Sequence, residues 1–199
     1  MNEGGFGSQF AKDKLGALTG TAKAAAPAAA APSPSAIAAN PGDILLVTIM
    51  SRNAVAPLTK IAQNGGTVTW ISPGKVSLTL KDDIVIATRG LNEDLMGATV
   101  TGVRAALAAG GGTARRTHSY LNSEDQIVLR DVDCTIVETG PETIAAATGS
   151  REAIKYTESC TSNTAIFTNS YWLDQRGGNV VQSRQAIAPT TGFLQINPL

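Results

Sequence analysis

This sequence is poor in the side chains that most often carry chemistry. Its 199 residues include two cysteines and one histidine, and charged residues make up 16% of the total. A zinc site needs about four ligands at characteristic spacing, which is more than these cysteine and histidine side chains supply. We therefore predict no metal site, and no pattern in the sequence indicates another cofactor.

An excess of either charge is missing as well. Lys plus Arg and Asp plus Glu each number 16, so the chain has no surplus of basic residues to recruit nucleic acid. The low share of charged residues is more typical of an extracytoplasmic β-protein than of a cytosolic helical enzyme. We expect no nucleic-acid partner.

The patterns of common catalytic and nucleotide sites are also absent. His118 would have to serve any Ser-His-Asp or Cys-His arrangement, but no serine lies in a G-x-S-x-G elbow. A histidine on the polar face of a strand is the alternative. The glycines at 4–7 and 110–112 do not match the phosphate-loop pattern G-x-x-x-x-G-K-[ST]. The sequence thus predicts no catalytic residues.

Long hydrophobic runs are missing too. No stretch of about eighteen apolar residues is present, so no transmembrane helix is expected. The start, MNEGG, has neither the basic nor the apolar region of a signal peptide. Two explanations for the missing signal peptide stay open: the protein is cytosolic, or an export signal was removed from the chain. The cysteines favour the second.

Residues 1–41 are predicted to be a flexible leader rich in Ala and Pro. Two helical turns are expected at residues 11–18, and beyond them prolines interrupt the Ala-rich stretch at positions 27, 32, 34 and 41. Each interior proline costs a helix roughly 3 kcal/mol, which favours an extended spacer. The spacer would hold the domain away from an anchor, or would simply be a disordered leader.

Residues 67–98 carry the clearest strand pattern. Apolar residues alternate with polar ones around 68–70 and 76–80, and a third apolar run covers 84–86. Ser72-Pro73-Gly74 and Asp82-Asp83 are expected to turn the chain between these strands. The pattern predicts an antiparallel meander whose apolar face needs a cover from the rest of the chain.

After Gly90 the hydrophobic period lengthens to that of a helix. Leu91 and Leu95 predict one short helix, and a second is expected from a Thr101 cap through Leu107. Further strands are expected at residues 42–52, 58–62, 113–121, 125–139, 156–160, 165–173, 179–187 and 193–196, with a turn at 174–178. Residues 42–199 are thus predicted to be one all-β domain, mainly an antiparallel sandwich or open barrel, with one or two short helices.

The two cysteines are the strongest candidates for a covalent feature. Cys134 lies inside one predicted strand and Cys160 ends another. We predict that they form a disulfide, which the loop-entropy model values at roughly 3.5 kcal/mol and which implies an oxidising compartment. Two buried free thiols in a cytosolic protein are the alternative.

Neighbouring carboxylates offer candidates for acid and base catalysis. Asp82 with Asp83, and Glu124 with Asp125, resemble the carboxylate pairs that cleave glycosidic bonds. Adjacent residues in a strand point to opposite faces, and both pairs lie at predicted turns. Solvated turn residues are therefore the favoured interpretation.

Aromatic residues in the predicted strands could serve as platforms for sugar rings. Trp70, Tyr120, Tyr171 and Trp172 are the candidates, although large aromatics in alternating strands are more often part of a core. Tyr171 and Trp172, with the nearby Arg184, are our candidates for contact with a sugar or a partner.

Several segments together resemble a known family. They are ATRGLNEDLM (87–96), YLNSEDQIVLRDVDC (120–134), ESC (158–160), FTNSYWLD (167–174) and QSRQAIAPTTGFLQINPL (182–199). In this order they resemble the YjbF/GfcB lipoproteins of exopolysaccharide and group 4 capsule operons. The resemblance covers about residues 43–199.

The resemblance implies a secreted, lipid-anchored periplasmic protein at the outer membrane, made as a lipidated precursor and associated with polysaccharide production or export. Cys134 and Cys160 look like the family's cysteine pair. The family's lipobox cysteine and signal peptide are absent from this chain, so either the chain was trimmed or this member is not lipidated. The family has no established catalytic residues to carry over.

Our main hypothesis is a non-enzymatic accessory lipoprotein of exopolysaccharide or capsule production or secretion. Its expected partners are the outer membrane, through a lipid anchor absent from this chain, and either polysaccharide export proteins or the polysaccharide itself. One alternative is a polysaccharide-modifying hydrolase with Glu124 and Asp125 as first candidates. The other is a polysaccharide-binding module that uses Tyr171, Trp172 and Arg184.

Overall fold

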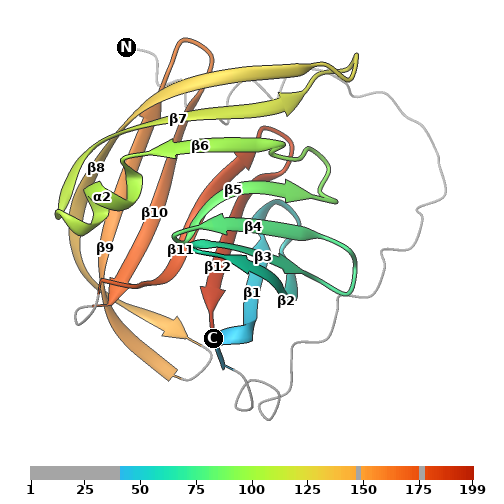
Figure 1. The fold of residues 1–199 in the computed structure, drawn as a ribbon. Helices are drawn as coiled ribbons and strands as arrows, with labels where there is room; N and C mark the ends of the chain where they lie inside the picture. The colour runs from blue at the N-terminus through green and yellow to red at the C-terminus, as the bar shows by residue number, and fades with distance from the viewer. Residues whose placement is uncertain (1–40, 147–148, 175–177) are drawn as a thin grey trace, which may run out of the picture.

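Twelve β-strands and one short α-helix form the part of the chain that the computed structural model describes, residues 41–146, 149–174 and 178–199 (Figure 1). The strands are β1 (Ile44–Ile49), β2 (Ala54–Asn64), β3 (Thr67–Ile71), β4 (Ser77–Lys81), β5 (Ile84–Arg89), β6 (Gly97–Thr101), β7 (Gly111–Leu121), β8 (Ile127–Ala146), β9 (Gly149–Thr161), β10 (Ile166–Asp174), β11 (Val180–Ala188) and β12 (Gly192–Pro198). The helix is α2 (Val103–Ala108), and two 3-10 turns, η1 (Pro41–Asp43) and η2 (Met50–Arg52), flank β1. The predicted leader, with its helix at 11–18, lies outside the described residues apart from Pro41.

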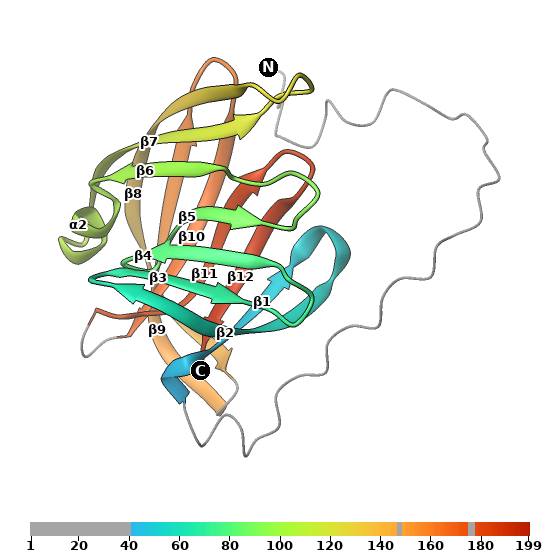
Figure 2. The ribbon, with the colours of Figure 1, turned by 45° about the vertical axis from the view of Figure 1, so that its right-hand side comes forward.

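All neighbouring strands are antiparallel, and they form a single sheet in the order β5-β4-β3-β2-β1-β12-β11-β10-β9-β8-β7-β6. The sheet curls until its edge strands β5 and β6 lie side by side (Figures 1 and 2). The result is a nearly closed barrel, which confirms the all-β class and decides between the two predicted architectures. None of the described helices is long and apolar enough to cross a bilayer.

The predicted meander is confirmed as β3, β4 and β5. Asp82 and Asp83 both have left-handed backbone angles, with φ of 50° and 69°, as a two-residue hairpin turn of the favoured hand requires. The β3–β4 turn differs in detail from the prediction, because Lys75 and not Gly74 takes the positive φ of 63°.

Inward-facing apolar side chains fill the barrel in two clusters. One cluster is formed mainly by β1, β12 and the meander, with single residues or pairs from β2, β7, β11 and the loop at 90–96. It contains Leu45, Val47, Ile49, Leu58, Trp70, Leu78, Leu80, Val85, Leu95, Tyr120, Ile187, Ala188, Leu194 and Ile196. The other gathers α2 with β7 to β11, and contains Ile84, Val103, Ala106, Leu107, Ala114, Val132, Cys134, Ile136, Tyr156, Cys160, Phe167, Tyr171, Leu173 and Val180. The barrel therefore has a packed interior, which each strand lines with every second residue.

The helix predicted around Leu91 and Leu95 is wrong. Residues 90–96 form a loop, in which the Asp94 carboxylate accepts hydrogen bonds from the backbone N–H groups of Gly90 and Leu91. Leu95 is still buried in the first cluster, so its apolar character reflects burial from a loop. The second predicted helix is confirmed as α2, although Gly102 precedes it where Thr101 was expected to cap.

Three predicted strands were too short. β8 and β9 continue to pair through residues 140–152, outside the predicted strand ranges, as far as Ala146 opposite Gly149. β2 runs from Ala54 to Asn64 and not only over 58–62. Of the turn expected at 174–178, residues 175–177 lie outside the described part, and Asp174 N–H donates to the Asn179 carbonyl across it.

The two ends of the barrel differ. β1 starts and β12 finishes at one end, where Leu199 N–H donates to the Ile44 carbonyl. Because the strands alternate in direction, the connections at 50–53, 72–76, 90–96, 122–126, 162–165 and 189–191 all lie at the opposite end, which we call the distal end (Figure 2). The chain thus enters the barrel at the end away from these loops.

Candidate functional site

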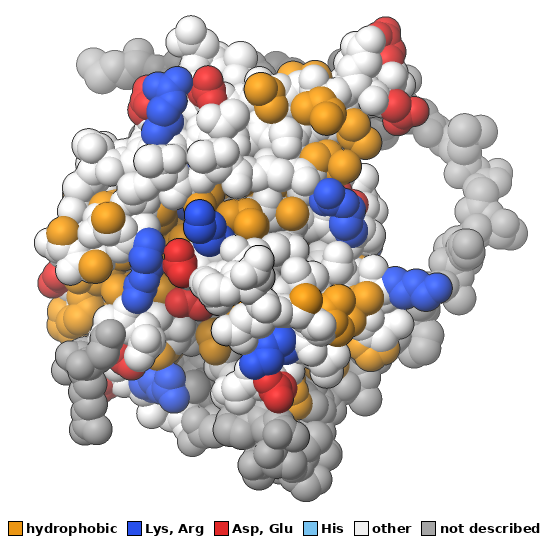
Figure 3. Space-filling view, viewed as in Figure 1, with side chains coloured by type: hydrophobic (Ala, Val, Ile, Leu, Met, Phe, Trp, Pro, Cys, Tyr) orange, Lys and Arg blue, Asp and Glu red, His pale blue; other side chains and the backbone are white. Residues whose placement is uncertain are grey.

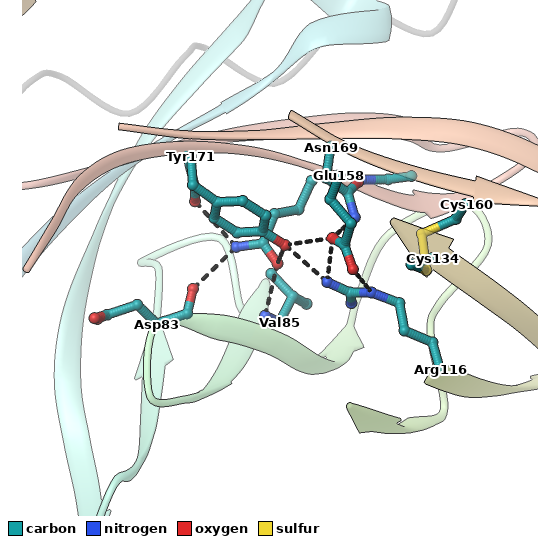
Figure 4. A network of polar contacts seen from close by, with 11 residues as sticks. Asp83, Val85, Arg116, Cys134, Glu158, Cys160, Asn169 and Tyr171 are labelled. Atoms are coloured by element: carbon teal, nitrogen blue, oxygen red, sulfur yellow. Dashed lines mark hydrogen bonds and ion pairs between the residues drawn. A yellow bond between two sulfur atoms is a disulfide. The ribbon is translucent and has the colours of Figure 1, made fainter. Parts of the chain in front are cut away.

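A group of polar side chains is buried inside the barrel, at inward positions of strands that are otherwise lined by apolar residues (Figure 4). Its members come from four strands: Arg116 on β7, Glu158 on β9, Asn169 and Tyr171 on β10, and Gln185 on β11. We call these five residues the interior network. Buried polar groups persist only when they are hydrogen-bonded, so each of these side chains needs partners inside the barrel.

Arg116 and Glu158 form the charged centre of the interior network. Arg116 Nε donates to Glu158 Oε1 at 2.8 Å, and its Nη2 donates to Oε2 at 2.7 Å. The same Nη2 donates to the Tyr171 hydroxyl at 2.7 Å, which in turn donates to Glu158 Oε2 at 2.9 Å. Both charged side chains are almost fully shielded from solvent, so each depends on the other for its counter-charge.

Asn169 and Gln185 connect this centre to the backbone. Asn169 Nδ2 donates to Glu158 Oε2 at 2.7 Å, while its Oδ1 accepts from Ala186 N–H at 2.8 Å. Gln185 Oε1 accepts from the backbone N–H of Val85, and its Nε2 donates to the carbonyl of Asp83, at 2.9 and 3.0 Å. The amide group of Gln185 therefore bonds to the backbone of β5 and of the turn before it, although β11 and β5 are not neighbours in the sheet.

The electrostatics fix the protonation states of the charged centre. Burial acts to raise the pKa of Glu158, but the Arg116 guanidinium and the hydrogen bonds to it outweigh burial and hold that pKa below its usual value. Burial likewise acts to lower the pKa of Arg116, yet Tyr171 and Glu158 raise it above the usual value. Burial raises the pKa of Tyr171 well above its usual value. The centre is thus a fixed ion pair, and its carboxylate is neither exposed nor free to accept a proton.

His118 lies nearby and is also buried. Tyr120 donates its hydroxyl proton to the Ile187 carbonyl at 2.8 Å, so His118 Nδ1, 3.0 Å from the same hydroxyl oxygen, is the donor in their contact. Its Nε2 then carries a lone pair with no partner in the described part of the chain. Burial and the nearby Arg116 lower the pKa of His118 to about 4. The histidine is therefore neutral near pH 7 and stacks on Phe167 in the core.

The predicted disulfide is present. Cys134 and Cys160 lie directly opposite each other on β8 and β9, with Cα atoms 4.0 Å apart, and their sulfurs are bonded. Glu158 is close to both sulfurs, within 4.8 Å, so these three side chains are a group that could in principle hold a metal ion. The sulfurs are bonded to each other and the carboxylate is paired with Arg116, so none of the three side chains is free to bind a metal ion.

The two aromatic candidates for sugar contact, Tyr171 and Trp172, are both buried. Tyr171 is 0% exposed and belongs to the interior network, so its ring cannot stack on a ligand at the surface. Trp172 points to the other face of the sheet but is also buried, in a small cluster with Ile144, Ala153 and Val181. Both side chains are large aromatics that the fold needs for packing. Arg184 is exposed and lies over the ring of Phe193, and its contact with a sugar stays a prediction.

The remaining sequence candidates lie in the core or at turns of the barrel. Trp70 and Tyr120 are core residues. Asp82 and Asp83 form the tight turn before β5, where Asp82 is exposed but Asp83 is half-buried, and burial raises the pKa of Asp83. Glu124 and Asp125 lie in the exposed turn between β7 and β8. The two pairs lie at opposite ends of the barrel, so the structure does not bring the four carboxylates together.

Sequence reasoning missed the interior network. One signal was available: Arg116 lies between Ala114 and His118 on the inward face of a predicted strand, and Glu158 lies between Tyr156 and Cys160 in the same way. Opposite charges at inward positions of two strands suggest a buried pair. Asn169 and Gln185 gave no such signal, since isolated amides in strands are common on exposed faces.

Comparisons with known proteins agree with this architecture. A solved structure titled as the hypothetical lipoprotein YmcC from Escherichia coli (K12) superposes with a TM-score of 0.71 at 20% sequence identity, covering 82% of this chain and 86% of that one. At this identity the likeness shows the fold alone. No curated protein matches the sequence.

A family model matches nearly the whole sequence, from residue 17 to residue 199. Its description is "Group 4 capsule polysaccharide lipoprotein gfcB, YjbF". The matched range contains all twelve strands, the interior network and the disulfide, so the match extends over the entire described barrel. The chain therefore belongs to the YjbF family of group 4 capsule polysaccharide lipoproteins.

Proposed function

We propose that this protein is a non-enzymatic accessory of capsule or exopolysaccharide production or secretion, held at the periplasmic face of the outer membrane by a lipid anchor upstream of the barrel. The observation that carries the proposal is the family match over residues 17–199. The disulfide adds support, because disulfides persist in oxidising compartments such as the periplasm.

The interior of the barrel supports a structural role over a catalytic one. Its buried carboxylate, Glu158, accepts four hydrogen bonds from Arg116, Asn169 and Tyr171. Its buried histidine is neutral and packed on Phe167. A general acid or base has to reach the proton that it transfers, and neither of these groups is accessible to a polysaccharide.

The placement is tested by following the full-length precursor in its own host. Cells labelled with a radioactive fatty acid should yield an acylated protein that fractionates with the outer membrane and is protected from protease outside intact cells. An unacylated protein in the cytoplasmic fraction would refute the placement.

The hydrolase alternative is tested separately, on the purified chain. Incubation with the capsule polysaccharide of the host should leave the molar-mass distribution of the polymer unchanged. Shortening of the polymer by the native protein, lost in a Glu124→Gln/Asp125→Asn variant, would establish the enzyme instead.

A further inference from the structure

The hairpin of β7 and β8 extends past its neighbours at the distal end of the barrel. β7 and β8 pair from Leu121 opposite Ile127 onward, whereas β9 pairs with β8 only from Asp133 onward. Within the described residues, the first six residues of β8 (127–132) therefore have a strand on one side and none on the other. An unpaired strand edge presents backbone N–H and C=O groups that can bind a further strand.

The outer face of this hairpin is apolar. Strand pairing puts Leu121, Ile127 and Leu129 on the face opposite to the buried Tyr120. Ile127 is 67% exposed and Leu129 is 65% exposed, which is unusual for large aliphatic side chains on neighbouring positions of one face. Figure 3 shows hydrophobic side chains gathered beside acidic ones at this end of the hairpin, at the upper right.

Acidic side chains flank the apolar residues on both sides. Glu124 and Asp125 lie in the turn beside Ile127. Asp131 and Asp133 follow Leu129 on the same outer face of β8, where Arg115 is 3.4 Å from each of them. Arg130, on the inner face of β8, lies over the ring of Tyr120. Two arginines against four carboxylates still leave the surroundings of the strand edge negative, so a complementary strand should carry basic residues at its ends.

We propose that the hairpin end, residues 119–133, binds an extended segment of another envelope protein by strand addition to β8. The segment would have apolar side chains at alternate positions, to cover Ile127 and Leu129, and Lys or Arg on either side to meet the carboxylates. Backbone bonds to the β8 edge would supply affinity, and the apolar and basic positions would supply specificity.

Two other occupants fit the surface less well. A second copy paired antiparallel about Leu129 would set Asp125 opposite Asp133 of its partner, and like charges opposite each other destabilise a strand pair. On a membrane, the acidic turn with Glu124 and Asp125 would make the first contact, and an anionic lipid surface would repel its carboxylates.

The purified chain allows a direct test with a synthetic peptide in which valine alternates with threonine between pairs of lysines. We expect saturable binding by fluorescence anisotropy, with amide NMR shifts confined to residues 119–133. A Leu129→Glu variant should weaken binding by about tenfold or more, since it removes the apolar contact from the centre of the edge. A peptide flanked by glutamates should bind more weakly than the lysine form, and added salt should reduce the difference between them.

Val137→Glu is the matched control. Val137 lies on the same strand and outer face and is 51% exposed, but β8 is paired on both sides there, with Gly111 and Thr157. This variant should bind the lysine-flanked peptide like the native chain. The proposal is overturned if no peptide binds, if Leu129→Glu and Val137→Glu behave alike, if sedimentation shows a dimer that Leu129→Glu dissociates, or if Leu129→Glu abolishes binding to lipid vesicles. Because the test needs neither host nor polysaccharide, its failure would leave the proposed capsule function standing.

Discussion

Arg116 on β7 and Glu158 on β9 form a two-bond ion pair across the intervening strand β8, with nitrogen–oxygen distances of 2.8 and 2.7 Å. Both side chains are almost fully shielded from water. A buried ion pair adds little net stability compared with well-packed apolar residues, but loss of one partner leaves an uncompensated buried charge. The pair therefore makes the correct alignment of three strands a condition for a stable interior.

Loss of one partner from this pair should be costly. We expect Arg116→Met and Glu158→Met each to lower the free energy of unfolding by about 3–5 kcal/mol in urea titrations. The double variant should lose clearly less than the sum of the two, because it leaves no unpaired charge. Additive losses in this double-mutant cycle would show that the two groups are not coupled.

The disulfide should contribute measurably to stability. Cys134 and Cys160 are 26 residues apart, and closing a loop of that length constrains the unfolded chain by roughly 3.5 kcal/mol. Reduction, or a Cys134→Ala/Cys160→Ala variant, should lower the melting temperature, whereas a chelator should leave it unchanged. Two free thiols per chain in a titration of the unreduced, unfolded protein would show that the bond does not form.

His118 should make the protein less stable in mild acid. Its pKa is lowered to about 4 in the fold, so below the unfolded value of 6.5 the unfolded chain binds a proton that the folded chain does not. Stability should thus fall as the pH decreases from 6.5 toward 4, by about 2 kcal/mol between pH 7 and pH 5.

A His118→Gln variant separates this effect from that of the carboxylates. The lowered pKa of Glu158 provides stability that is present above its usual pKa and is lost only at lower pH, outside this window. The difference in unfolding free energy between pH 7 and pH 5 should therefore shrink in His118→Gln. An unchanged difference would assign the pH dependence to other groups.

Gln185 should hold the edge strand β5 in place, where it lies beside the other edge strand, β6. In a Gln185→Leu variant the N–H of Val85 and the carbonyl of Asp83 lose their partner, at a cost of about 1–3 kcal/mol for an unsatisfied buried group. Amide hydrogen exchange should accelerate at Val85 more than in β8, which is not paired with β11. Uniform acceleration over all strands would indicate global destabilisation only.

Local patterns predicted the elements whose side chains alternate strictly. The meander was readable because Leu78 and Leu80 point inward between polar neighbours, and because Asp82-Asp83 has the chemistry of a tight turn. The helix predicted at Leu91 failed for a physical reason. Its i,i+4 spacing was real, but Asp94 bonds the loop backbone in place of a helix, and Leu95 is buried from that loop.

The interior network depended on information that no local pattern contains. Arg116 meets Glu158 only because β7, β8 and β9 pair in one particular register. Gln185 reaches Asp83 and Val85 only because the curled sheet brings β11 across from β5. The disulfide was easier to predict from the sequence, since two cysteines allow a single pairing.

We propose that this chain serves capsule production without processing the polymer. The most direct measurement is the amount of capsule polysaccharide on the surface of host cells that lack this gene, quantified with an antibody or lectin against the polymer and compared with the total polymer of the culture. We predict that the deletion reduces surface capsule, and that the native gene and a Glu124→Gln/Asp125→Asn version both restore polymer of normal length. Surface capsule of normal amount and length in the deletion strain would contradict the account.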